Sequence, residues 1–526
     1  MTWTKFLAVA ALVLALAAPP GASAALFKWA NNGDVNAMDP YTRNETFQLS
    51  FLLNIYEPLI RRDRNLGLEP ALATKWEQTS PTVWRFTLRP GVKWQDGTAF
   101  TADDVVFSAT RIRSANSVMR SVLAPVREVR KIDDLTVEIE TNKVDPIFPQ
   151  EITTWSMMSR AWCEKNNTVE PVNLSSNTEN YAIRNAMGTG PFKLVLREPD
   201  RRTILEPNPD WWDKPQHNLT RVELSIISNA ATRVAALLSG DVDMIYSVPP
   251  QDEARIKAAP GLNLIVGSEL RTIFLGMDQS RAELLQSSVK GRNPFKDVRV
   301  REAFVLAIDE DAIASRVMRG QAHVTWIMFG PGVNGYDPAQ DKRPKADVAR
   351  AKALMTEAGY GDGFSLAMDC PNDRYENDEA ICTAVAAMLA RINVKIDLNA
   401  QTKVRYFNKI GPPDYSTDFY MLGWTPNTYD AHNVFYNLMI TRSSPRGEVN
   451  DGDYSNPEID RLTDQIAVET DPDKRAAMIH QAVEIVQKDF GYIPLHQQVI
   501  AWAAKSNIEL VQLADNYFPL RFVRVK

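Results

Sequence analysis

Residues 72–111, LATKWEQTSPTVWRFTLRPGVKWQDGTAFTADDVVFSATR, contain the succession of strand, turn and helix that decides the fold class. Apolar side chains stand at every second position at Trp84, Phe86 and Leu88, which predicts a strand with one buried face. Thr101 precedes the next apolar stretch, and its hydroxyl can accept hydrogen bonds from the first amides of a helix, so a helix is predicted to follow it. A strand followed closely by a helix is typical of α/β domains.

The C-terminal half continues this alternation without internal repeats. The predicted elements are a helix over residues 346–358, a strand over 365–368, a helix over 379–392, a strand over 394–398, helices over 457–468 and 473–489, and a strand over 492–497. Gly359 is expected to end the first of these helices, because glycine tolerates the left-handed backbone found there. This order predicts an α/β protein with a mostly open sheet. No linker divides the chain, so we expect strands that cross between lobes and act as a hinge.

The length and composition of the chain restrict the classes of protein to which it can belong. The chain has 526 residues, of which 24% are charged, with a formal net charge of −6, so two or three domains of ordinary globular composition are expected. The acidic balance argues against nucleic acid as the main partner and disfavours anionic membrane surfaces. Three cysteines are too few for a disulfide-dense scaffold or a cysteine-built zinc module.

Residues 1–24 have the layout of a secretory signal peptide. Lys5 supplies the positive charge, residues 6–18 form an apolar run, and small residues end the segment at Ala24. We expect cleavage near Ala24 and a soluble periplasmic protein, since no later stretch approaches about 18 apolar residues in a row. No cysteine near the cleavage site could carry a lipid. An uncleaved membrane anchor is the alternative.

Cys370 and Cys382 are close in sequence, in a chain that we expect to be exported to an oxidising compartment. A disulfide between them is predicted, and a pair of buried thiols is the alternative. Cys163 is left over and is expected to be a small buried apolar residue.

Motifs of catalysis and metal binding are missing from the sequence. There is no H-E-x-x-H and no G-x-S-x-G, and the five histidines are dispersed. Residues 287–290, Ser-Ser-Val-Lys, match S-x-x-K, but neither S-D-N nor K-T-G follows. The sequence therefore predicts neither an enzyme nor a bound metal or cofactor. A secreted hydrolase with an unrecognised carboxylate pair is the alternative from the enzyme class.

Four stretches resemble the extracytoplasmic solute-binding proteins of ABC importers, the family of the dipeptide-, oligopeptide- and nickel-binding proteins. They are residues 72–111, GTGPFKL at 188–194 with EPNPDWWD at 206–213, NPFKDVRVREAFVLAID at 293–309, and DFYMLGWTPNTYD at 418–430. They occur in the family's order and span nearly the whole mature chain. We expect most of these residues to build the scaffold rather than to contact a ligand.

The resemblance implies a two-lobed α/β periplasmic binding protein of class II, cluster C type, with an extra subdomain inserted in the first lobe. It implies a first lobe of residues 25–270 plus 496–526, with the inserted subdomain over about 65–185, and a second lobe of residues 271–495. A monomer would close over a solute and deliver it to an ABC permease, with no cofactor. Peptides and amino-acid-derived compounds, including opine-like ones, are the expected solutes, while an oligosaccharide or a metal complex remains open. A chaperone-like or signalling receptor that uses the same clamp is a further alternative.

Tyr246 and Ser247 lie in a segment similar to the one where oligopeptide binders place an aromatic and a polar residue against the ligand. The resemblance implies these roles for both residues. A tyrosine can stack on the solute or form a hydrogen bond with it, and a place in the core is the alternative. Phe274, near the expected hinge, is a further ligand-binding candidate with the same alternative.

Trp424 marks the segment where peptide-binding members hold the ligand's amino group through a carboxylate three residues later. That position is Asn427 here, and an amide cannot provide the charge-assisted hydrogen bond that an ammonium group prefers. Asp430 can supply the charge instead, or it can cap a turn. Tyr429 and His432 flank Asp430 and are further candidates for lining residues.

Arg374 lies near the place where dipeptide binders present an arginine to the ligand's carboxylate. Its guanidinium group suits a carboxylate or a sulfonate, and an ordinary surface arginine is the alternative. If Arg374 and Asp430 both line the cleft, we expect a zwitterionic or amino-acid-derived solute.

Overall fold

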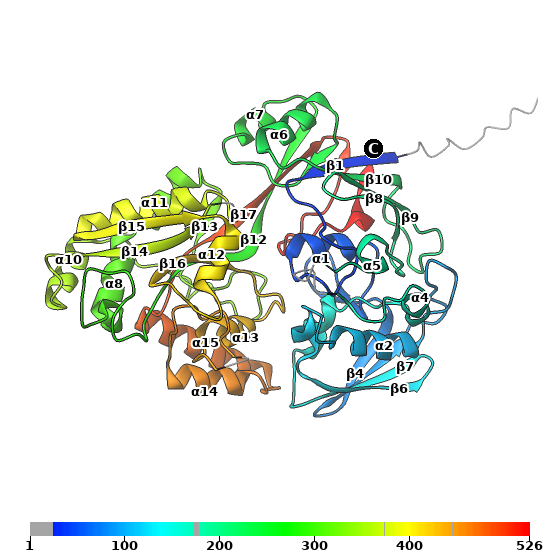
Figure 1. Cartoon of the computed structure of the whole chain (residues 1–526), viewed down its shortest axis with the longest axis horizontal. Coiled ribbons are helices and arrows are strands. Elements are labelled where there is room, and N and C mark those ends of the chain that lie inside the picture. Colours follow the sequence, from blue (N-terminus) through cyan, green and yellow to red (C-terminus); the bar gives the residue numbers. More distant parts are fainter. Residues whose placement is uncertain (1–24, 173–177, 373, 444–445) are drawn as a thin grey trace, which may run out of the picture.

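Two long antiparallel strands, β12 (Leu262–Met277) and β17 (Ile493–Lys505), run between the two lobes of the molecule (Figure 1). The computed structural model describes residues 25–172, 178–372, 374–443 and 446–526. The second half of β12 pairs with β16 (Phe419–Trp424) in the second lobe, while the end of β17 pairs with β11 (Met244–Ile245) in the first. The strand predicted over residues 492–497 therefore continues to Lys505 and crosses the molecule.

The crossing strands belong to one large mixed sheet that extends into both lobes. From the second lobe to the first, its main path runs β15 (Val394–Gln401), β14 (Phe364–Pro371), β16, β12, β17, β11, β1 (Ala25–Asn31), β10 (Leu219–Ile226), β9 (Arg202–Pro207) and β8 (Phe192–Glu198); off this path, β13 (Ala322–Val324) pairs with β17. The mixed α/β architecture with two lobes agrees with the predicted fold class.

Helices cover the second lobe, and their ends follow local sequence signals. They are α8 (Val298–Ala307), α10 (Val348–Glu357), α11 (Asp378–Leu389), α14 (Pro457–Ile466) and α15 (Pro472–Asp489). Asn456 and Asp471 cap the last two helices, each followed by proline at the first helical position, where its fixed φ suits the helix. Gly359 has the expected positive φ of 79° just after α10. The helices predicted from 346 and 379 are confirmed within a few residues.

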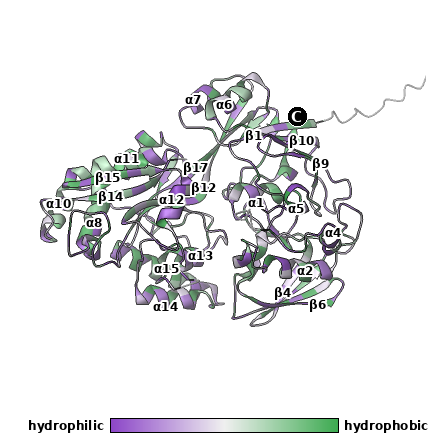
Figure 2. Ribbon diagram, in the orientation of Figure 1, coloured by the Kyte–Doolittle hydropathy of each residue, from purple (hydrophilic) through white to green (hydrophobic). Residues whose placement is uncertain are grey.

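Hydrophobic and hydrophilic residues alternate along these helices, as Figure 2 shows for α14 and α15. In α14 the residues Ile459, Leu462 and Ile466 are buried, at the spacing of one helix face. Among the described residues, none of the helices has the length and apolar character needed to cross a bilayer. The predicted signal peptide lies outside the described residues.

A separate four-stranded antiparallel sheet includes the two strands that residues 72–111 form. Its order is β4 (Ala73–Ser80), β5 (Val83–Leu88), β7 (Thr136–Thr141) and β6 (Val126–Asp133). The predicted strand is β5, in which Phe86 and Leu88 are buried and Trp84 is half-buried. Thr101 is the N-cap of α2 (Ala102–Ile112), as predicted. The sheet lies within the proposed inserted subdomain, whose limits stay a proposal, as do the lobe boundaries inside β12 and β17.

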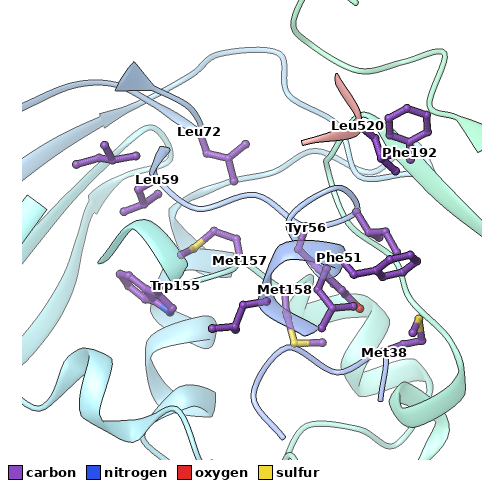
Figure 3. Packing of buried hydrophobic residues seen from close by; sticks show 14 of the residues in the cluster. Met38, Phe51, Tyr56, Leu59, Leu72, Trp155, Met157, Met158, Phe192 and Leu520 are labelled. Atoms are coloured by element: carbon purple, nitrogen blue, oxygen red, sulfur yellow. The ribbon is translucent and has the colours of Figure 1, made fainter. Parts of the chain in front are cut away.

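The core of the first lobe joins segments that are distant in sequence. Figure 3 shows Phe51 and Tyr56 near Trp155, Met157 and Met158, and all five belong to one hydrophobic cluster. This cluster also includes residues of β5, α2 and the C-terminal segment. Burial of so many large side chains is the main source of stability for this lobe.

One buried carboxylate ties several family-like segments together. Glu57 accepts hydrogen bonds from the Thr189 hydroxyl at 2.9 Å and from the indole nitrogens of Trp211 and Trp212 at 3.1 and 2.8 Å. Burial raises the pKa of Glu57, while Arg61 and these donors oppose the shift. The segments GTGPFKL and EPNPDWWD therefore meet at Glu57 and build scaffold.

The cysteines take the arrangement that the sequence predicts. Cys370 and Cys382 form a disulfide between the end of β14 and α11, with Cα atoms 6.6 Å apart. Cys163 is free and buried, and burial raises the pKa of its thiol to about 11.

Gly188 provides a test of the scaffold, because a Cβ there would lie 1.9 Å from the backbone oxygen of Ile55. We expect Gly188→Ala to lower the free energy of unfolding by roughly 3 kcal/mol, since backbone atoms must shift. Gly33→Ala is the control, because a Cβ at Gly33 meets nothing within 4 Å, and its effect should stay within about 0.5 kcal/mol. Equal denaturation midpoints for the two variants would contradict this packing.

The disulfide can be tested by mass spectrometry of the mature protein, denatured without reductant and treated with an alkylating agent. We expect one alkylated cysteine, Cys163, and a peptide pair linked through Cys370 and Cys382. Alkylation of all three cysteines without reduction would show that the disulfide does not form.

Candidate functional site

The crossing strands lose their regular pairing where the lobes meet. The register shifts in β12 between Ser268 and Thr272, and the buried residues Glu269 and Arg271 lie in this interval. A nitrogen of Arg271 lies 2.9 Å from an oxygen of Glu269 and donates to the Gln498 side-chain oxygen at 3.3 Å. A buried, mutually compensated charge pair therefore occupies the junction of the lobes.

The loop before α11 brings Arg374 and Tyr375 of the second lobe to this junction. The Tyr375 hydroxyl accepts from the amide of Gly423 at 2.9 Å, and the Arg271 guanidinium lies 5.9 Å from the Tyr375 ring centre. Arg374 is half-buried, and its guanidinium carbon lies 5.2 Å from the same ring centre. In the part of the chain that the structure describes, its guanidinium makes no ion pair. Arg374 thus stays available as a cation beside the crossing strands.

Ser247 lies at the edge of the junction, on the side of the first lobe. It has a positive φ of 60°, and its hydroxyl accepts from the buried Arg233 guanidinium at 3.4 Å. Glu376 of the second lobe interacts with Arg233 electrostatically, and burial raises the pKa of Glu376 to about 7 although Arg233 opposes the shift. The Ser247 hydroxyl therefore lies beside a guanidinium that interacts electrostatically with a carboxyl group of the other lobe.

Tyr246 packs in the core of the first lobe. Its ring centre lies 6.1 Å from that of Trp29, 5.8 Å from that of Phe47 and 5.1 Å from that of Trp502. Its hydroxyl donates to the backbone oxygen of Asn516 at 2.5 Å. The aromatic side chain is thus surrounded by protein, which matches the alternative reading of this position.

Phe274 also lies in a core, and this placement corrects its candidacy as a ligand residue. It is fully buried in a hydrophobic cluster of the second lobe, with its ring centre 5.6 Å from that of Tyr492. The physical reason is its place in β12, where β16 and β17 flank the strand on both edges. A solute cannot reach this side chain without opening the core.

Asp430 is fully buried, and both of its oxygens are committed. Arg475 donates to them through two nitrogens, each at 2.7 Å, and the Asn334 side-chain amide donates at 2.8 Å. Asp430 also caps the short helix α13 (Ala431–Val434), accepting from the amide of His432 at 2.8 Å. The proposed role as a free ammonium anchor is therefore corrected: Asp430 has a structural partner, and capping was the right alternative.

The remaining candidates of this segment form a chain of hydrogen bonds. The Trp424 indole donates to the side-chain oxygen of Asn433 at 2.9 Å, and the Asn433 amide donates to the side-chain oxygen of Asn427 at 2.8 Å. Asn427 is exposed. Burial lowers the pKa of His432 to about 4, so this imidazole is neutral at physiological pH, and its ring centre lies 5.7 Å from that of Tyr436. Trp424 and Asn427 thus present a polar, uncharged surface.

Tyr429 connects the second lobe to a cavity in the first. The cavity is open to solvent, and its empty space together with the adjoining solvent amounts to about 680 Å³; Glu57, Arg61, Arg62, Tyr429, Asp515 and Tyr517 are among its lining residues. The Tyr429 hydroxyl donates to Asp515 at 2.6 Å, and the Arg62 guanidinium carbon lies 4.1 Å from the Tyr429 ring centre. Burial raises the pKa of Asp515 to about 6, with the Tyr429 hydrogen bond opposing the shift.

Sequence reasoning included Tyr429 but missed Arg62, Asp515 and Tyr517. Arg62 lies hundreds of positions before Asp515 and Tyr517, and each of the three stands in a segment without a local motif. Only the docking of the C-terminal segment against α1 (Thr46–Leu52) brings them together, for example through the amide of Phe518, which donates to the Ser50 hydroxyl at 2.7 Å. No periodicity or spacing in the sequence signals such a contact.

The S-x-x-K match has no catalytic geometry. The Ser287 hydroxyl donates to the backbone oxygen of Ser365 at 3.0 Å, while the Lys290 ammonium lies 3.2 Å from Glu283. Serine and lysine therefore have separate partners. Over residues 25–172, 178–372, 374–443 and 446–526, no group of three or more histidine, cysteine, aspartate or glutamate side chains is placed to hold a metal ion.

Comparison of the sequence with known proteins identifies the family of this chain. Residues 67–445 match the family model described as bacterial extracellular solute-binding proteins, family 5 Middle. The chain belongs to this family. It is 26% identical over 512 residues to the periplasmic oligopeptide-binding protein OppA of Haemophilus influenzae, covering 89% of this chain and 87% of the relative. It is 27% identical over 450 residues to the dipeptide-binding protein of Escherichia coli K12, covering 80% and 79%.

Solved structures share the fold. The periplasmic binding protein DppA from Helicobacter pylori, solved in complex with the peptide STSA, superimposes with a TM-score of 0.79 at 22% identity, covering 95% of this chain and 98% of that one. The two lobes joined by crossing strands are therefore the architecture of periplasmic binding proteins of this family.

Measurements of stability can test whether Asp430 has a structural role. Asp430→Asn removes the carboxylate that the buried Arg475 guanidinium contacts at 2.7 Å and leaves Asp145 as a longer-range counter-charge, so we expect the free energy of unfolding to fall by about 3 kcal/mol in chemical denaturation. Asn427→Asp, three residues away on an exposed side chain, is the control and should change it by no more than about 0.5 kcal/mol. An Asp430→Asn variant with unchanged stability would disprove the structural assignment.

Proposed function

We propose that this protein is the periplasmic solute-binding component of an ABC importer and captures a peptide or amino-acid-derived solute between its two lobes. The observation that carries the proposal is the family membership, together with two lobes that the strands β12 and β17 join. A solute that contacts both lobes stabilises the closed arrangement over the open one, and the closed shape is what a permease can recognise. The protein binds and releases its solute without a chemical reaction.

The relatives named for oligopeptides and dipeptides support this solute class. The site differs from a simple peptide site in its charges, however. Asp430 is bound to Arg475, and Asn427 is an uncharged amide, so this segment offers no free carboxylate to a ligand's ammonium group. Arg374 remains as a cation for a carboxylate. A solute that carries a carboxylate and a blocked or secondary amine fits these groups better than an ordinary free-amine peptide.

Location and partners follow from the same proposal. The signal peptide, cleaved near Ala24, delivers the chain to the periplasm, as the names of the relatives suggest for them. The mature protein works there as a monomer and meets the permease subunits at the inner membrane. Of the ligand-binding residues predicted from the sequence, we propose that three contact the solute: Arg374, Trp424 and Tyr429.

Native mass spectrometry of the purified protein tests this function. We expect a fraction of the protein to carry a small compound that is released on denaturation, and calorimetric titration of that compound should show submicromolar to micromolar binding without turnover. Arg374→Ala should weaken binding about tenfold or more, because a charge-assisted hydrogen bond is lost. Arg391→Ala, at an exposed arginine just beyond the opposite end of α11, is the control.

Two results would reject the proposal. One is conversion of the retained compound into a product by the purified protein, which would indicate an enzyme. The other is failure to bind any member of a mixture of peptides and acylated amino acids by a protein that is shown to be folded and free of ligand.

A further inference from the structure

The cavity beneath Tyr429 contains three guanidinium groups with very different partners. Arg61 lies 2.7 Å from Glu69, 2.6 Å from Asp213 and 3.7 Å from Glu57. Arg521 lies 2.8 Å from Glu69. Arg62 makes no ion pair in the part of the chain that the structure describes. Its charge is therefore the least compensated of the three.

The hydrogen bonds of Arg62 leave part of its guanidinium unused. One terminal nitrogen donates to the backbone oxygen of Leu66 at 3.0 Å. The other makes only long contacts, at 3.4 Å to the backbone oxygen of Gln150 and 3.5 Å to that of Thr428. The Nε atom is buried and has no partner among the described residues. An arginine binds a carboxylate best through two adjacent nitrogens, and Nε with the weakly bonded terminal nitrogen form such a pair.

Tyr429 and Tyr517 complete the surroundings of Arg62. The Tyr429 ring lies against the guanidinium, 4.1 Å from its carbon atom, and holds the planar group in place. Tyr517 lines the same cavity and interacts with Arg62 electrostatically. A tyrosine hydroxyl can donate to a bound oxyanion.

Asp515 and Asp63 are carboxylates that interact electrostatically with Arg62. Asp515 is the one that lines the cavity. Its two oxygens accept from the Tyr429 hydroxyl at 2.6 Å and from the amide of Tyr517 at 2.8 Å. Neither oxygen makes an ion pair with Arg62 in the described part of the chain. Asp63, the neighbour in sequence, accepts from the amides of Asn65 and Gly67 in its own turn.

The geometry points to Arg62 as a binding site for a carboxylate of the solute within the cavity under Tyr429. This inference rests on the proposed function and extends it, because it assigns a second anionic anchor besides Arg374. A solute with two carboxylates, or with one carboxylate and a long acyl or peptide chain, can occupy the cavity and the junction of the lobes together.

The test compares two probes that differ only in charge at one end. N-acetyl-alanyl-alanine carries a carboxylate and no amine, and its carboxamide carries neither. Calorimetric titrations would be run on the full mature protein and on the variants Arg62→Gln, Arg62→Lys and Arg64→Gln. Arg64 is the matched control, because it is exposed, lies two residues away and contacts Gln216 outside the cavity. Thermal unfolding of each variant checks that it is folded.

We expect the wild-type protein to bind the carboxylate probe about tenfold more tightly than the carboxamide, since each charge-assisted hydrogen bond contributes about 1.5–3 kcal/mol. Arg62→Gln should reduce this preference to the part that Arg374 supplies, Arg62→Lys should keep more of it, and Arg64→Gln should retain it in full. A folded Arg62→Gln protein with the full preference would overturn the inference, and so would a wild-type protein that shows no preference or binds neither probe. The proposed function is tested separately, by whether native mass spectrometry finds a small compound bound to the purified protein.

Discussion

The antiparallel pairing of β12 with β17 is the constraint on which the rest of the molecule depends. Their backbone hydrogen bonds form ladders on both sides of the junction and resist stretching, so the lobes do not move apart along the strands. The ladder is irregular between Ser268 and Thr272, and an irregular strand bends and twists more easily than a regular one. Motion of the lobes is thus confined to rotation about this interval, which also carries the Glu269 and Arg271 pair.

Some charged side chains near the junction form buried ion pairs with other side chains, and others make no ion pair in the described part of the chain. The pairs Glu269 with Arg271 and Asp430 with Arg475 are buried, and breaking such a pair leaves an uncompensated charge at a cost of about 3–5 kcal/mol. A solute gains less than this from one hydrogen bond to a charged group, about 1.5–3 kcal/mol, so it cannot recruit Asp430. Under the proposed function, recognition then depends on groups that make no ion pair in the described part of the chain, and we propose that Arg374 and Arg62 are two of them.

Whether the sequence predicts an interaction depends on how far apart its partners stand along the chain. The cap at Thr101, the end of α10 at Gly359 and the burial of Phe86 and Leu88 depend on residues within a few positions, so local patterns predicted them. The family-like segments predicted two lobes. The partner of Asp430 stands 45 positions later, and nothing in the spacing selects Arg475 among the chain's other cations. The cavity was beyond prediction for the same reason, because Arg62, Tyr429 and Asp515 meet only in the folded chain.

Tyr429 belongs to the second lobe but forms part of the wall of a cavity in the first, so movement of the lobes changes this cavity. Its hydroxyl binds Asp515 and its ring covers Arg62, both in the first lobe, although Tyr429 itself follows β16 in the second. Rotation of the lobes that withdraws Tyr429 must therefore remove one hydrogen bond and one stacked ring from the cavity wall. A carboxylate on Arg62 is best held when Tyr429 is in place, and contacts that differ between two states are the ones that shift their populations. If a carboxylate binds Arg62 as we propose, its binding is linked to closure through Tyr429 and the neighbouring Thr428 backbone oxygen.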